Sequence, residues 1–465
     1  MGQAAPSVAP GDRQAWWLDE APPDEAAPPL AGDLEADVAI VGGGYTGLWT
    51  ALALKEREPA LDVGVLEQEF CGFGPSGRNG GFVESFWAPL ARLRERVGDE
   101  GALAVARAST GVFAAVRALG EDVWLRESGM LKVSTQPSQD ADVEHGVEAA
   151  AELGAPEEAV ALSREDVAAR CSSPRFRAGV LFPSVGTVQP ARLVRALRRA
   201  AVARGVRLYE GTRATRIADG LVETAGGRVR APEVVVATNA WTTGWRPAGR
   251  RLTNFGSYVV LTEPAPDALA EIGWTGGEAI VDGRMFLHYF RATEDGRVLM
   301  GSGSGPIGFG GRVDRRFTHD APSVARAEAG LRDLLPGLAG TKVERAWGGP
   351  IDVSSDHLPF FSTVPGTRMH FGAGYSGNGV GPSWLGGQIL ASLVLGVDDE
   401  WSRLPLATRK VPSFPPEPVR LLGGGLVRWG ILAVEEAEEK GRRPPPGAHF
   451  VSTLPRRLGL RVGTR

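Results

Sequence analysis

A glycine-rich turn between an apolar strand and a helix constrains the fold of this chain more than any other segment. Residues 38–41 are apolar and predict a short buried strand, and residues 48–54 carry apolar side chains at helical spacing. Between them, Gly42, Gly44 and Gly47 follow the G-x-G-x-x-G pattern. Such a turn admits a phosphate to the free N–H groups at the start of the helix, and it is typical of an α/β sheet that binds a dinucleotide.

An acidic residue ends the next predicted strand. Residues 63–66 are apolar, and Glu67 follows them, 20 residues beyond Gly47. A carboxylate at this position can accept hydrogen bonds from a ribose diol, whereas it would repel a 2′-phosphate. The segment therefore predicts a site for NAD or FAD and not for NADP. The motif alone does not separate NAD from FAD, and the alternative is a glycine turn with a purely structural role.

Length and composition exclude several classes of protein. A chain of 465 residues is too long for one ordinary core, so we expect two domains. The net charge of −4, without a basic block, does not suggest a nucleic-acid partner. Two cysteines, Cys71 and Cys171, cannot form a disulfide framework and predict a reducing, cytoplasmic location. The six histidines are scattered without metal-ligand spacing, so we expect no metal.

Both ends of the chain are rich in proline. Residues 1–32 lack the features of a signal peptide and predict an extended N-terminal arm, in which Trp16 and Trp17 are expected to dock onto the folded body. Residues 401–465 predict a C-terminal tail. Its most apolar stretch, residues 421–434, is too short to span a bilayer and contains Arg428, so we expect a packing helix or strand and no membrane span.

Three further segments predict loops at the edge of the dinucleotide sheet. Residues 71–81 are glycine-rich and carry Ser76, Arg78 and Asn79, and they leave the carboxyl end of a strand, where open α/β sheets bind ligands. Residues 238–241 follow an apolar strand at 233–237. Residues 372–383 form a second glycine-rich turn into a helix, whose N–H groups could face a ring carbonyl or developing negative charge. The alternative for the first two is a loop without a ligand.

A predicted hairpin carries the candidate substrate-binding residues. Residues 284–292 and 297–301 read as strands around a turn at 293–296. Alternation along the first strand places Tyr289 and Arg291 on one face, where they could clamp a substrate carboxylate. The alternative is that these two side chains interact in the core. We also expect helices at 99–120, 143–170 and 318–335, a strand at 343–347 and a polar loop at 348–359.

Taken together and in this order, the motifs resemble the FAD-dependent D-amino-acid oxidase superfamily, which includes glycine and sarcosine oxidases, and in particular its gamma-glutamylputrescine oxidase-type members. The resemblance covers most of residues 12–400 and rests on Trp16–Leu18, Asp37–Gly47, Glu67, Ser76–Gly81, Val188–Leu193, Ala237–Ala240, Tyr289–Arg291, Asp356–Pro359 and Gly374–Gly379. It implies an α/β fold, α+β overall, with a Rossmann-like FAD-binding domain (33–90, 170–245 and 340–400) and a discontinuous antiparallel-sheet substrate domain (91–169 and 246–339).

The resemblance also implies which residues contact the cofactor. Carried over position by position, these are Gly42, Gly44, Tyr45, Thr46, Gly47, Glu67, Ser76, Gly77, Arg78, Asn79, Gly80, Gly81, Ala214, Thr238, Asn239, Ala240, Trp241, Gly377, Asn378, Gly379 and Val380. Some relatives attach flavin to a cysteine in the C-terminal half. This chain has no cysteine after Cys171, which implies non-covalent FAD.

The implied activity is oxidation of the C–N bond of an amine or amino acid, by hydride transfer to flavin N5 and hydrolysis of the imine. O2 or another acceptor would reoxidise the flavin. No catalytic acid or base is identified by the motifs. The alternatives are an NAD-linked dehydrogenase and a non-catalytic flavin-binding interaction module.

Overall fold

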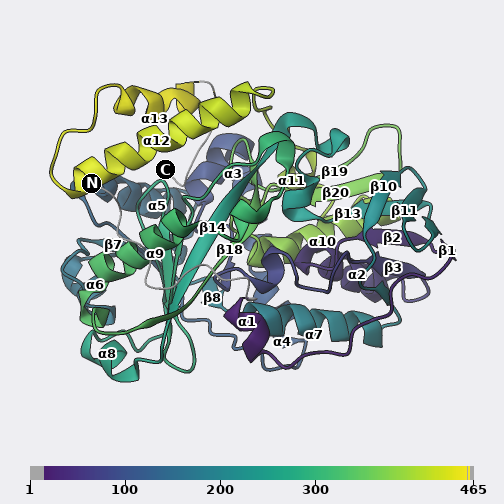
Figure 1. The fold of residues 1–465 in the computed structure, drawn as a ribbon, viewed down its shortest axis with the longest axis horizontal. Coiled ribbons are helices and arrows are strands. Elements are labelled where there is room, and N and C mark those ends of the chain that lie inside the picture. Colours follow the sequence, from purple (N-terminus) through teal and green to yellow (C-terminus); the bar gives the residue numbers. More distant parts are fainter. Residues whose placement is uncertain (1–14, 458, 461–465) are drawn as a thin grey trace.

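The computed structural model describes residues 15–457, 459 and 460. Two large sheets organise it, and they lie side by side in Figure 1, the one with β2 and β3 at the right and the one with β14 and β18 at the centre and left. The dinucleotide turn belongs to the first sheet and the predicted hairpin to the second. Loops of the two sheets meet between them and line a common cavity.

The first sheet has six strands in the order β19-β20-β13-β2-β3-β9. All neighbouring strands are parallel except β19. Its strands are Phe360–Thr363, Met369–Ala373, Glu233–Val236, Val38–Val41, Val63–Leu66 and Arg207–Tyr209. Because strand side chains alternate, Val38 and Ile40 pack into the helical layer, whereas Ala39 and Val41 pack against a smaller sheet on the other face.

Helices cover one face of this sheet and a four-stranded sheet covers the other. The helices are α2 (Tyr45–Arg57), α7 (Pro190–Ala203) and α10 (Val380–Leu395), and α2 packs against both others. The small sheet has the order β1-β12-β11-β10, with strands Leu34–Glu35, Arg228–Arg230, Leu221–Thr224 and Ala214–Ala218. The predicted α/β arrangement around the glycine turn is confirmed.

The second sheet has eight strands in the order β18-β14-β17-β16-β15-β5-β7-β6. They are Val343–Ser354, Leu252–Thr262, Val298–Ser302, His288–Ala292, Ala279–Asp282, Met130–Val133, Gly179–Phe182 and Val160–Leu162. One pair, β15 with β5, is parallel, so the sheet is mixed and not purely antiparallel as predicted. Helix α9 (Ala321–Leu334) packs on it and follows its N-cap Asp320, whose side chain accepts the Ser323 N–H.

Several predicted elements differ from the observed ones. The helix expected at 143–170 is α5 (Asp140–Glu152), strand β6 and α6 (Arg164–Arg170), the last begun by a capping box at Ser163. Instead of beginning near Asp99, α3 (Leu90–Ser109) starts earlier and kinks at Gly98, with φ 74°. Strand β18 extends through residues 348–354, which were expected to be a loop, because they pair with β14.

Strands β7 and β18 were assigned to the cofactor domain, but both belong to the eight-stranded sheet. We therefore propose that each large sheet forms the centre of one domain, so that β7 and β18 belong to the substrate domain and not to the cofactor domain. Other elements of the body are α4 (Gly111–Arg117), α8 (Pro266–Glu271), α11 (Pro405–Thr408) and the paired strands β4 (Phe82–Glu84) and β8 (Val185–Thr187).

Both ends of the described chain pack on the body. Helix α1 (Trp16–Glu20) buries Trp17 completely, so the predicted docking of the tryptophan pair is confirmed. Beyond residue 401 the chain is not merely a tail: α12 (Val419–Glu439) and α13 (Ala448–Arg457) pack on each other across the top of Figure 1. The stretch 421–434 is thus part of a packing helix.

Candidate active site

The turn from β2 into α2 is too tight for side chains at two of its glycines. A Cβ on Gly47 would lie 2.0 Å from the carbonyl oxygen of Gly42. Gly42 has φ 115°, and a Cβ there would lie 2.4 Å from the carbonyl oxygen of Ala237. The backbone of the turn therefore approaches both the helix and the neighbouring strand as the motif predicts.

Glu67 fixes the other side of the turn. Its Oε2 accepts the Gly43 N–H at 2.8 Å and its Oε1 accepts the Glu69 N–H at 3.1 Å. Burial raises the pKa of this carboxyl above its ordinary value, although the two N–H donors oppose the shift. Each oxygen retains acceptor capacity for a further donor, such as a hydroxyl.

A cavity of about 310 Å³ extends from this turn along the sheet edge. The cofactor residues expected from the sequence that line it are Gly42, Gly44, Tyr45, Thr46, Glu67, Ser76, Asn79, Ala214, Thr238, Asn239, Trp241, Gly377, Gly379 and Val380. Arg78, Gly80 and Asn378 line a second cavity instead, while Gly47, Gly77, Gly81 and Ala240 line neither. The structure thus brings most of the predicted set together from five separate segments, 42–46, 67–79, 214, 238–241 and 377–380.

Asp352 is a residue of this cavity that the sequence did not indicate. Its carboxylate is fully buried and accepts the Tyr375 N–H at 3.1 Å, the Gly374 N–H and the Asn239 side-chain amide at 2.9 Å. Burial raises its pKa to about 6. These bonds hold the turn before α10 against the loop after β13. Its position in β18, expected to be a loop, concealed this role.

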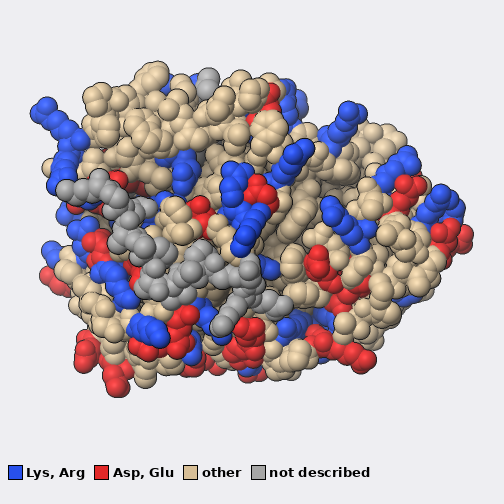
Figure 2. Space-filling model, viewed as in Figure 1, with Lys and Arg blue, Asp and Glu red and all other residues tan. Residues whose placement is uncertain are grey.

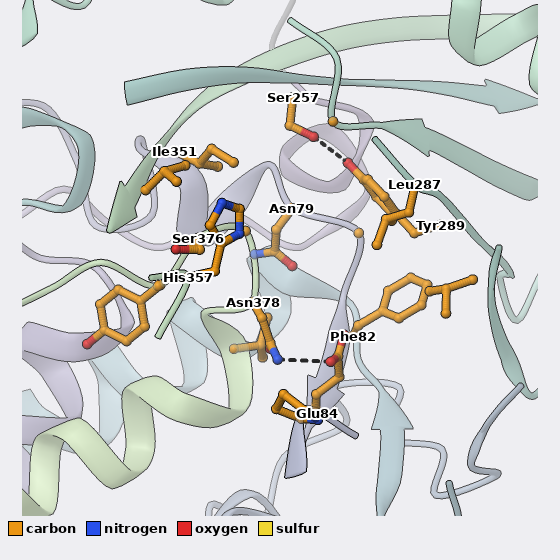
Figure 3. A pocket seen from close by; sticks show the side chains of 18 of the residues that line it. Asn79, Phe82, Glu84, Ser257, Leu287, Tyr289, Ile351, His357, Ser376 and Asn378 are labelled. Atoms are coloured by element: carbon orange, nitrogen blue, oxygen red, sulfur yellow. Dashed lines mark hydrogen bonds between the residues drawn. The ribbon is translucent and has the colours of Figure 1, made fainter. Parts of the chain in front are cut away.

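The second cavity, of about 280 Å³, adjoins the first. Both are lined by Pro75, Asn79, Ile351, Tyr375, Gly377 and Val380. Most of the second cavity's wall is apolar. Phe82 and Phe86 come from β4 and the segment after it, and the eight-stranded sheet and its loops supply Met130, Phe182, Phe255, Val281, Met285, Phe286, Leu287 and Trp347. Figure 3 shows Phe82, Leu287 and Tyr289 on one side of it and His357, Ser376 and Ile351 on the other.

The predicted clamp of Tyr289 and Arg291 is not assembled. Tyr289 lines the second cavity and shares a 2.8 Å hydrogen bond with Ser257. Arg291 does not line it: the side chain is fully buried, and its guanidinium donates to the carbonyl oxygens of Val188 (2.5 Å) and Gly81 (3.5 Å). Burial lowers the pKa of Arg291 to about 9. Both residues lie near each other as alternation predicts, but Arg291 supports the loops behind the cavity.

Two carboxyl groups line the second cavity, and their environments differ. Glu84 Oε2 accepts the Asn378 side-chain amide at 2.9 Å, as Figure 3 shows, and burial raises its pKa to about 7 despite the opposing charge of Arg92. Burial alone would also raise the pKa of Asp282, but His288 and Arg284 outweigh it and the net shift is downward. Glu84 therefore titrates near neutral pH, whereas Asp282 stays ionised.

Helix α12 supports one wall of this cavity. The loop after β15 contributes Met285, Phe286 and Leu287 to the lining. The Met285 N–H donates to Glu435 at 2.6 Å, Phe286 packs with Val427 and Ile431, and Arg284 pairs with Glu439 at 2.9 Å. This contribution of the C-terminal region was not predicted, since its charges and apolar residues carry no recognisable motif.

Comparison with known proteins identifies the class. Residues 37–393 match the family described as FAD dependent oxidoreductase. The chain belongs to this family. It is 30% identical to a probable oxidoreductase OrdL of Rhizobium meliloti, over 88% of this chain and 93% of that protein. It is 29% identical to the gamma-glutamylputrescine oxidoreductase of Escherichia coli, over 83% and 89%. The structure of glycine oxidase from Geobacillus kaustophilus shares the fold, with a TM-score of 0.67, 23% identity and coverage of 80% and 98%.

The resemblance inferred from the motifs is thus confirmed, and the NAD-linked alternative is excluded by the FAD-dependent family. The residues present fit FAD, because the glycine turn, Glu67, Ala214, Gly377 and Val380 all line one cavity. A Cβ at Gly44 would crowd Ser76 Oγ at 2.9 Å, so the turn needs glycine there. The cavity continues from Glu67 and Ala214 to Gly377 and Val380 without interruption. Within residues 15–457, 459 and 460, no cluster of three metal-ligating side chains occurs and no helix is long and apolar enough to cross a membrane.

Proposed function

We propose that the first cavity holds FAD and that the second binds the substrate, an amine that carries an apolar substituent and that the flavin oxidises. In this assignment the turn at Gly42–Gly47 receives the pyrophosphate, Glu67 the adenosine ribose and Gly377–Val380 the flavin ring. The single observation that supports it is that the two cavities adjoin and share Asn79, Tyr375 and Val380 as lining residues. When bound, FAD supplies the acceptor, at N5, for the hydride that leaves the substrate carbon.

The lining of the second cavity supports the choice of substrate. Aromatic and methionine side chains form most of its surface, and Arg291 does not reach it. Burial of an apolar substituent there contributes about 25 cal/mol for each Å² removed from water. Tyr289 and Ser257 offer hydroxyl groups that can orient a polar atom of the substrate.

Glu84 is our candidate for the proton acceptor. An amine enters mainly as a cation but must be neutral to lose a hydride, so a group in the cavity has to accept its proton. A carboxylate whose pKa lies near 7 can do so at neutral pH, and the Asn378 amide holds it in place. The resulting imine then hydrolyses to a carbonyl compound and an amine or ammonia.

The test is anaerobic reduction of the bound flavin by a panel of amines and amino acids. The loss of flavin absorbance measures the reduction. We expect benzyl-substituted amines to reduce it more efficiently than glycine. In the unaltered protein kcat/KM should depend on pH between about 6 and 8, which is roughly one pH unit on either side of the pKa of Glu84. This dependence should be lost in Glu84→Gln. An unchanged profile would exclude Glu84 as the acceptor, and reduction by glycine alone would exclude the apolar substrate.

Three further features belong to the same proposal. Cys71 and Cys171 are buried free thiols, and neither lines the two cavities, which supports FAD bound without a link to cysteine. Free thiols also favour the reducing cytoplasm as the location. Oxygen uptake during turnover, measured beside reduction of an artificial dye, assigns O2 or another molecule as the electron acceptor.

A further inference from the structure

Helix α12 exposes an apolar stripe on the side that faces away from the body. The exposed fractions are 56% for Val419, 68% for Leu422, 50% for Leu426 and 45% for Trp429. These residues are spaced three, four and three apart, which places them on one face of a helix. The opposite face carries Val427 and Ile431, which pack against Phe286. Packing within the chain therefore explains only one of the two apolar faces.

The stripe is part of a larger surface formed by residues 419–457, which we call the α12–α13 hairpin. Helix α13 packs on α12 and exposes Phe450, at 54%. Five of the nine exposed large apolar side chains in the described chain lie on this hairpin, so they are concentrated rather than scattered. Figure 2 shows that the surface over α12 and α13, at the top, is largely uncharged.

The segment that follows α12 is cationic, whereas α12 itself ends with Glu435, Glu436, Glu438 and Glu439. Glu436 and Glu438 are exposed, and Glu436 pairs with Lys440. The last 26 residues, 440–465, contain seven Lys or Arg and no Asp or Glu, although the whole chain has a net charge of −4. Arg442 and Arg443 are exposed in the loop between the two helices, and Arg456 and Arg457 are exposed at the end of α13. An apolar helix face beside exposed cations is the combination that binds the surface of an anionic bilayer.

We propose that the α12–α13 hairpin binds the surface of a membrane that contains anionic lipid, with α12 lying in the plane of the interface. The apolar stripe would enter the boundary between headgroups and acyl chains, where Trp429 is suited to lie, and the arginines would contact lipid phosphates. A second copy of this chain is the weaker candidate, because it would bring another uninterrupted cationic segment to the same surface. The proposal does not depend on the reaction.

The experiment is co-sedimentation of the full-length, FAD-loaded protein with vesicles of phosphatidylcholine, with or without phosphatidylglycerol. We expect binding that requires phosphatidylglycerol and weakens as salt is added. The double variant Leu422→Ser/Leu426→Ser should bind about tenfold more weakly. Val202→Ser/Val397→Ser is the matched control, since both valines are exposed, at 48% and 43%, and lie on other elements. It should bind like the unaltered protein.

Flavin content and turnover of all variants in the absence of vesicles show whether they are folded. Arg442→Gln/Arg443→Gln tests the electrostatic part and should reduce the salt dependence. No sedimentation with either kind of vesicle would overturn the proposal. So would equal binding by both double variants, or an oligomer, detected by light scattering, that dissociates only in Leu422→Ser/Leu426→Ser while vesicles remain unbound.

Discussion

The two adjoining cavities are built largely by different parts of the polypeptide. Six of the residues that line the first are glycines, which present main chain to it, in the β2–α2 turn, the loop after β3 and the turn before α10. The second is formed by side chains from the eight-stranded sheet, its loops and strand β4. A site lined by main chain can keep its shape while the sequence varies, whereas a site lined by side chains changes with each substitution. The first is therefore suited to a fixed cofactor and the second to a variable substrate.

The largest effect is expected where the main chain has no spare space. Gly47→Ala places a Cβ 2.0 Å from the Gly42 carbonyl oxygen and should lower the free energy of unfolding by about 3 kcal/mol, with loss of FAD. Thermal unfolding and the flavin absorbance of the purified protein measure both. Gly340→Ala is the control, since nothing lies within 4 Å of its added Cβ. A yellow, stable Gly47→Ala protein would show that the turn can relax.

Glu84, in the second cavity, should make the stability of the protein depend on pH. Its pKa of about 7 in the folded protein exceeds its ordinary value of 4.5, so the native state binds more protons than the unfolded state between these values. The stability should therefore fall as pH rises from about 4.5 to 7, by at most about 3 kcal/mol. Urea unfolding of the protein and of Glu84→Gln across this range measures the difference. If the stability of the two proteins changed with pH in the same way, the Glu84 carboxyl would lie in a more polar environment than proposed.

Arg291 tests whether a buried cation belongs to the cavity or to its support. Removal of its side chain leaves the Val188 and Gly81 carbonyls without this donor, so Arg291→Ala should cost about 2 kcal/mol of stability. KM should change by the same factor for amines with and without a carboxylate. Arg216→Ala, at an exposed strand position, is the control. A rise in KM only for substrates with a carboxylate would instead support the hypothesis that Tyr289 and Arg291 clamp that group.

Glu67 should give the smallest effect, confined to the main-chain cavity. Glu67→Gln retains one acceptor oxygen and should weaken FAD binding about tenfold, corresponding to about 1.4 kcal/mol. Fluorescence titration of the apoprotein measures this affinity. Glu69→Gln, two residues further and exposed, should bind FAD normally. Equal affinities would remove Glu67 from the assigned ribose contact.

The same difference explains what the sequence could predict. Gly42, Gly47 and Glu67 are recognisable because tight turns and ribose contacts require particular residue types at fixed spacing. Glu84, Asp282 and Phe286 carry no such pattern, since their proximity depends on how distant strands pair. Arg291 was correctly placed beside Tyr289 by alternation, but alternation gives no depth, and burial of its guanidinium against main-chain carbonyls was not visible. Asp352 was concealed by the expectation of a loop in β18.

Trp17 has a practical consequence for protein engineering. Its indole N–H donates to the carbonyl oxygen of Asn79 at 2.9 Å, and its main-chain oxygen accepts the side-chain amide of Gln189. The start of the described chain thus anchors a loop that lines both cavities. Trimming the protein to its family-matched region, which begins at residue 37, would remove that anchor. A shortened version prepared for crystallisation or immobilisation should therefore retain residues from Trp16 onward if it is to keep its flavin.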